Sequence, residues 1–175
     1  GAYAFTKEDF LNRLDIPRGL NLSIMINGKD LIFNNELILE RVDLLVPVES
    51  KHSKVNLIRV ACELDDFKKI IPALHKIKDK GYLTGVNIMK ISQLDSNELF
   101  NIGLIASESN VDVLYFADSL GSLEPDNIKN IINCLKKYWN GEIGFHAHDN
   151  KGLALQNTLK AVKEGVSWVD STVTG

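Results

Sequence analysis

The sequence predicts an α/β fold in which a parallel sheet carries helices on its outer face. Short apolar runs of strand length recur along the chain, and amphipathic segments of helical spacing stand between them. The runs begin roughly every 25–35 residues, which is the length of one strand–helix unit. Strands that are buried on both faces are almost continuously apolar, so these runs indicate a parallel sheet.

Six strands and the helices between them account for most of the chain. The expected strands are Leu22–Ile26, Leu57–Cys62, Leu83–Met89, Val113–Asp118, Glu142–His148 and Trp168–Val173. Apolar faces at helical spacing follow the second, fourth and fifth of them. Pro72 lies within the first of these helical patterns, where it either occupies a first turn or kinks the helix. Pro125 marks the start of the next helix, and the last runs from about Gly152 to Glu164.

The regular period favours a TIM (β/α)8 barrel over a doubly wound sheet. Neither common glycine-rich phosphate loop is present, which argues against a nucleotide-binding fold. A complete barrel takes about 200–250 residues, and this chain has 175. We therefore expect one domain, residues 1–175, that forms a truncated barrel without its first strand–helix unit and its last helix.

The composition limits which partners the protein is expected to bind and where in the cell it is expected to be. A net charge of −3 gives no broad attraction to nucleic acid or to anionic membranes, and no apolar run is long enough to cross a bilayer. The only cysteines, Cys62 and Cys134, lie far apart in the sequence, which is typical of a reduced, cytoplasmic protein. A truncated barrel would expose sheet edges, so we expect a homo-oligomer that binds neither nucleic acid nor membrane.

Two histidines at the end of the fifth strand give the strongest functional signal. Side chains two residues apart in a strand share a face, so His146 and His148 project together. In a barrel the active site lies at the C-terminal ends of the strands, where two imidazoles can hold one divalent metal ion. They can equally be two histidines that make ordinary hydrogen bonds. Asn150 either supports the ligands from behind or caps the following helix.

Other polar residues at or near strand ends are further candidates. Asp118 is a candidate catalytic carboxylate or a turn-capping residue, and Ser119 either binds a substrate carboxylate or shapes the turn. Arg59, inside an apolar strand, either acts on a substrate carboxylate or forms a structural salt bridge. Asn87, also inside a strand, is either a substrate-binding residue or a structural one. Lys90 raises a rival mechanism, a Schiff base with a keto acid.

Two more residues stand at strand ends by the same rule. Thr172, near the end of the last strand, is a candidate substrate-binding residue. Cys62 ends the second strand, where it lies near the site or fills the core as a small hydrophobe.

Several motifs together resemble a known enzyme family, the DRE-TIM metallolyases. The superfamily includes 3-hydroxy-3-methylglutaryl-CoA lyase, 4-hydroxy-2-oxovalerate aldolase, and the isopropylmalate and citramalate synthases. The resemblance covers about Leu22 to Gly175, and its look is closest to the 4-hydroxy-2-oxovalerate aldolase-like branch. The segments that carry it are Ile58–Ala61, Ala117–Gly121 with Pro125, Gly144–Asn150, Leu153–Thr158 and Val169–Gly175.

The resemblance implies a TIM barrel that binds a divalent metal, most often Mn²⁺, with Mg²⁺, Zn²⁺ or Co²⁺ as alternatives. It implies that His146 and His148 are metal ligands, and that the metal stabilises an enolate of a 2-oxo acid. The family also carries an Arg-Asp pair on its first strand, whose Asp is a metal ligand, and no such motif occurs in this sequence. We expect that the chain alone binds metal weakly and is inactive.

The leading hypothesis is a metal-dependent aldolase or carbon–carbon lyase that acts on a 2-oxo acid, a small-molecule substrate. The first alternative is a Claisen-type synthase that joins an acyl-CoA to a 2-oxo acid. A Schiff-base aldolase that uses Lys90 is a second alternative. A barrel without catalytic activity that serves as an interaction module is the third.

Overall fold

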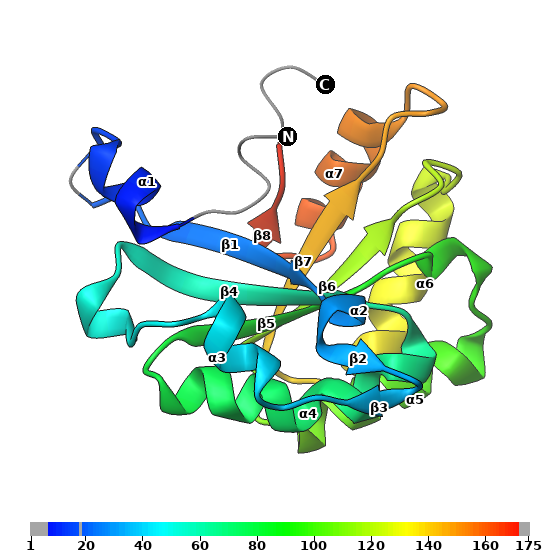
Figure 1. Ribbon diagram of the computed structural model, residues 1–175. Coiled ribbons are helices and arrows are strands. Elements are labelled where there is room, and N and C mark those ends of the chain that lie inside the picture. The colour runs from blue at the N-terminus through cyan, green and yellow to red at the C-terminus, as the bar shows by residue number, and fades with distance from the viewer. Residues whose placement is uncertain (1–6, 18, 172–175) are drawn as a thin grey trace.

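The computed structural model describes residues 7–17 and 19–171. One parallel sheet of six strands curls through the molecule, and helices line its outer side (Figure 1). In spatial order its strands are β1 (Leu22–Asn27), β4 (Val55–Cys62), β5 (Leu83–Ile88), β6 (Val113–Asp118), β7 (Glu142–Ala147) and β8 (Trp168–Val169). Spatial order follows chain order, which is the arrangement of successive strand–helix units.

Helices α4 to α7 connect the strands of the sheet from β4 onward. The long helices are α4 (Leu64–Asp79), α5 (Ser96–Glu108), α6 (Pro125–Lys136) and α7 (Ala154–Lys163). Shorter elements are α1 (Glu8–Arg13), α2 (Gly28–Leu31), α3 (Arg41–Leu45), the 3₁₀ turns η1 (Ser50–His52) and η2 (Ile91–Gln93), and a hairpin of β2 (Ile32–Phe33) and β3 (Glu36–Leu37). No helix in the described part of the chain is long and apolar enough to span a membrane.

The parallel sheet predicted from the sequence is confirmed, and all six expected strands are present. The predicted start of the last helix is wrong by two residues. Gly152 has a φ of +71°, which is outside the helical region, so α7 begins at Ala154. Pro72 lies in the interior of α4 rather than in its first turn. The expected strand from Trp168 ends at Val169, and its predicted end at Val173 lies outside the described residues.

The main hydrophobic core lies between the sheet and its helices. Phe116 and Phe145, on neighbouring strands β6 and β7, are fully buried, and their ring centroids are 4.7 Å apart. Because side chains alternate along a strand, their sequence neighbours Tyr115 and His146 project to the opposite, inner face of the curled sheet. The core therefore leaves the inner face free for polar residues. Strands β1 and β8 form the two edges of the sheet. The homo-oligomer expected from exposed sheet edges stays a prediction.

Candidate active site

The C-terminal ends of β4 to β8 bring together several of the residues singled out from the sequence. His146 is the second-to-last residue of β7, and His148 follows directly after that strand ends. Their rings meet edge to face with centroids 5.1 Å apart. The prediction that the two side chains share one face is confirmed. Strand spacing alone places them there, as expected for residues two apart.

His146 is held by an aspartate from the neighbouring strand. Asp170 follows β8, and its Oδ2 lies 2.8 Å from Nδ1 of His146 and 2.7 Å from Nη1 of Arg59. Burial raises the pKa of Asp170, but hydrogen bonds from His146 and Arg59 outweigh it and hold that pKa below its ordinary value. The carboxylate therefore stays ionised at neutral pH, as an acceptor for both partners.

Arg59 reaches this aspartate from β4, across the inner face of the sheet. Its Nη1 contacts both oxygens of Asp170, and its guanidinium lies over the ring of Tyr115, 4.5 Å from the centroid. Burial raises the pKa of Tyr115 to about 12, so the phenol stays neutral. A Cβ at Gly144 would approach the Tyr115 ring to 2.3 Å, so the glycine provides the space that the ring occupies. Of the two roles considered for Arg59, this geometry agrees with the structural salt bridge.

Asp118 lies on the other face of β6, turned away from the histidines. It is completely buried, and its two oxygens accept the backbone N–H groups of Ser122 and Leu123, each at 3.0 Å. Gly121, between strand and helix, has a φ of +56°, and a Cβ there would lie 2.8 Å from the backbone nitrogen of Asn150. This geometry favours the turn-capping alternative for Asp118 over a catalytic role.

Ser119 and Lys90 connect two neighbouring strand ends. The Ser119 hydroxyl accepts the backbone N–H of Lys90 at 3.0 Å, which leaves its own proton for a ligand. Lys90 adopts a left-handed backbone conformation with a φ of +56°, and its ammonium lies 2.8 Å from Glu63. Its side chain is 45% exposed. A Schiff-base lysine requires desolvation, so this setting does not support that alternative.

Three candidates remain: Asn87, Asn150 and Thr172. Asn87 on β5 is buried, and its Oδ1 has no hydrogen-bond partner within the described ranges 7–17 and 19–171. Asn150 donates to the carbonyl of Leu120 at 3.1 Å, so it ties the loop after β7 to the loop after β6. It does not cap α7, because Asp149 accepts the N–H of Ala154. Thr172 lies outside the described residues.

Cys62 fills the hydrophobic core, which is the second of the two roles considered for it. Its side chain is 2% exposed, and burial raises the pKa of the thiol above its ordinary range. A neutral thiol in an apolar environment is neither a nucleophile nor a metal ligand.

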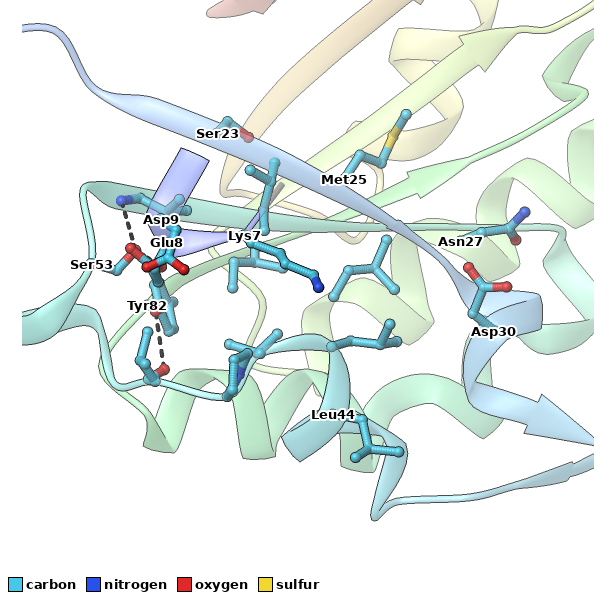
Figure 2. A pocket seen from close by; sticks show the side chains of 18 residues that line it. Lys7, Glu8, Asp9, Ser23, Met25, Asn27, Asp30, Leu44, Ser53 and Tyr82 are labelled. Carbon is cyan, nitrogen blue, oxygen red and sulfur yellow. Dashed lines mark hydrogen bonds between the residues drawn. The ribbon is translucent and has the colours of Figure 1, made fainter. Parts of the chain in front are cut away.

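A cavity of about 680 Å³ lies elsewhere, beneath β1 on the side that faces α3 (Figure 2). Aliphatic side chains such as Ile24, Ile26 and Ile58 line it, and Glu8, which accepts a hydrogen bond from Ser53, closes one end. The cavity exists because only short elements, α2, α3 and the β2–β3 hairpin, cover this part of the sheet. None of the candidate site residues lines it.

The donor set at the end of β7 fits a divalent metal in part. A neutral His146 that donates from Nδ1 to Asp170 has its Nε2 lone pair available, and His148 supplies a second ring nitrogen beside it. Catalytic metal sites usually take three ligands from the protein. No cluster of three His, Cys, Asp or Glu side chains suited to a metal occurs within the described residues. The described residues therefore offer two ring nitrogens here, one fewer than the usual number of protein ligands.

Sequence reasoning missed two residues of this arrangement. Asp170 and Tyr115 were not candidates, although both contact Arg59. One signal could have found Asp170: it follows a strand directly after the histidine strand, at the edge where parallel strands end together.

Comparison with known proteins places the chain in a family. The family model described as HMGL-like matches residues 23–175. The chain is 30% identical to a 4-hydroxy-2-oxovalerate aldolase of Brevibacillus brevis over 68% of this chain and 35% of that protein. It is 26% identical to a 4-hydroxy-2-oxovalerate aldolase of Bacillus cereus over 89% of this chain and 50% of that one.

A solved structure agrees with the sequence matches. The N-terminal domain of a putative aldolase from Bacteroides vulgatus superposes with a TM-score of 0.74 at 28% identity, over 89% of this chain and 49% of that one. The chain thus spans half or less of the length of these relatives. The prediction of a curled, TIM-barrel-type sheet is confirmed, and so is the resemblance to the metallolyases. The chain belongs to the HMGL-like family.

Proposed function

We propose that the protein is a divalent-metal-dependent aldolase that breaks or forms a carbon–carbon bond next to a 2-oxo acid. The observation that carries the proposal is the pair of imidazoles at the C-terminal end of β7, one of them oriented by a carboxylate. The names of the relatives support the substrate class, because 4-hydroxy-2-oxovalerate is itself a 2-oxo acid.

In this proposal His146 and His148 hold the metal, with Mn²⁺ as the first ion to test. A bound divalent ion supplies Lewis-acid polarisation of the substrate carbonyl. In this proposal the substrate is bound by Asn87, whose buried Oδ1 has no partner among the described residues, and by Ser119, whose hydroxyl accepts the backbone N–H of Lys90. Asp118 positions the loop that carries Ser119 rather than touching the substrate.

Cleavage of a 4-hydroxy-2-oxo acid passes through an enolate that these residues must stabilise. When the bond between C3 and C4 breaks, its electron pair stays on C3 as an enolate, the C4 hydroxyl gives its proton to a base, and C4 becomes the carbonyl carbon of an aldehyde. The enolate then takes a proton at C3 and leaves as a 2-oxo acid with a methyl group. Side chains that donate hydrogen bonds to the carboxylate or carbonyl hold the enolate planar and exclude water.

The test is deuterium exchange into the methyl group of pyruvate by the full-length protein, which reports enolate formation without an aldehyde partner. We expect exchange with Mn²⁺, loss of exchange with EDTA, and loss in His146→Ala. His52→Ala is the matched control, because His52 is an exposed histidine in η1, remote from β7. Exchange that survives EDTA or the His146 substitution would contradict the proposal.

A further inference from the structure

A carboxylate lies behind one histidine of the pair and not behind the other. Asp170 accepts from Nδ1 of His146 at 2.8 Å, and its backbone N–H donates to the carbonyl of Phe145 at 3.2 Å. The second bond ties the aspartate to β7 itself, one residue before the histidine. His148 makes no comparable hydrogen bond through its ring within the part of the chain that the structure describes; its ring contact is with His146.

The aspartate is itself fixed from the opposite side of the sheet's inner face. Arg59 holds both oxygens of Asp170 through Nη1, at 3.0 and 2.7 Å, and its side chain is only 14% exposed. Tyr115 lies against the guanidinium on one side. Gly85, on the strand beside β4, leaves room for the arginine stem, because a Cβ there would lie 3.1 Å from its Cγ. An arginine so enclosed has few other rotamers, so the position of Asp170 is well defined.

The chemical consequence concerns which ring nitrogen of His146 carries the proton. An ionised carboxylate can only accept, so Nδ1 must be the donor, and the lone pair of a neutral ring is then on Nε2. A metal ligand needs such a lone pair in a fixed direction, and a hydrogen bond to the other ring nitrogen provides both tautomer and direction.

We propose that Asp170, anchored by Arg59, is a positioning residue that fixes the Nδ1–H tautomer and the ring orientation of His146. This inference rests on the proposed function only in treating His146 as a metal ligand. Arg59 then acts through Asp170, and it is not the residue that grips a substrate carboxylate. The two histidines are unequal: Asp170 orients His146, and no carboxylate orients His148 among the described residues.

The first experiment measures the tautomers directly in the metal-free protein. Long-range ¹H–¹⁵N correlation spectra of the imidazole rings are recorded at about pH 8, above the usual imidazole pKa of about 6.5. We expect His146 in the Nδ1–H form and His148 as a mixture. In Asp170→Ala the His146 signals should move to the mixed pattern. Asp170→Asn removes the charge and offers an amide N–H that can donate to Nδ1, so here too the His146 signals should move away from the Nδ1–H form.

The second experiment measures the metal affinity of the full-length protein, with Co²⁺ absorption as the readout. Loss of a carboxylate partner behind a metal-ligating histidine weakens affinity by about 10–100-fold, so we expect a loss of that size for both Asp170→Ala and Asp170→Asn. Asp112→Asn is the control. Asp112 is also a paired, partly exposed aspartate, but it precedes β6 at the opposite end of the strands and bonds Lys78. It should leave both Co²⁺ affinity and the His146 tautomer unchanged.

The two experiments separate failure of this inference from failure of the proposed function. A wild-type His146 in the Nε2–H form, or an unchanged spectrum in Asp170→Ala, overturns the positioning role. If Asp170→Ala does not fold, the spectra of wild type and Asp170→Asn decide. If the tautomers behave as expected but the full-length wild type binds no Co²⁺, the positioning stands and the metal-dependent function fails.

Discussion

Replacing Asp118 with alanine tests whether this buried carboxylate is structural. Its two oxygens accept the backbone N–H groups of Ser122 and Leu123, each at 3.0 Å, and no part of the side chain is exposed. Leaving a buried donor without a partner costs about 1–3 kcal/mol. Two such donors give an expected loss of about 2–6 kcal/mol in the free energy of unfolding. The loop that carries Ser119 should loosen at the same time.

Urea denaturation followed by circular dichroism measures this loss. Asp126→Ala is the matched control, because Asp126 is an exposed aspartate in the first turn of α6. Its removal should cost no more than about 1 kcal/mol, the size of a helix-dipole interaction. Asp118→Asn should lie between the two, since one acceptor oxygen remains. A loss below about 1 kcal/mol in Asp118→Ala would refute the reasoning and return Asp118 to the catalytic candidates.

Two further predictions concern packing and charge. Gly144→Ala places a Cβ 2.3 Å from the buried ring of Tyr115, so it should destabilise the protein by about 1–3 kcal/mol; unchanged stability in urea would contradict this packing. Burial raises the pKa of Asp112, but bonds from Lys78 and Thr84 outweigh it and lower that pKa below the usual 3.8. A lowered pKa adds stability above the unfolded value and loses it as pH falls through the folded value. Asp112→Asn should therefore lower stability at neutral pH and flatten its decline below about pH 4, and parallel acid-denaturation curves would argue against this role.

The sequence predicted the sheet well because its signal is local. Strands β4 and β6 are mostly apolar runs, and each is followed by a helix with a clear apolar face. The connection between β1 and β4 gave no such signal. It consists of a one-turn helix, a hairpin of two-residue strands and α3, none of them long enough to show a period.

Only those features of the site that depend on the geometry of a single strand could be predicted from the sequence. His146 and His148 share a face by strand geometry alone. Asp118 was ambiguous because a turn-capping aspartate and a catalytic one at a strand end look the same in sequence. The hydrogen bond between His146 and Asp170 and the salt bridge to Arg59 join residues 24 and 111 positions apart. Such pairs depend on how far the sheet curls, which is a tertiary property that no local pattern contains.

In the proposed function the histidine pair at the end of β7 holds a divalent metal ion. The most direct test is anomalous scattering from crystals of the full-length protein soaked in Mn²⁺, recorded on both sides of the manganese edge. We expect one strong peak within about 2.0–2.3 Å of Nε2 of His146 and of a ring nitrogen of His148. A well-ordered β7 with no peak there, or a peak bound only elsewhere, would contradict the account.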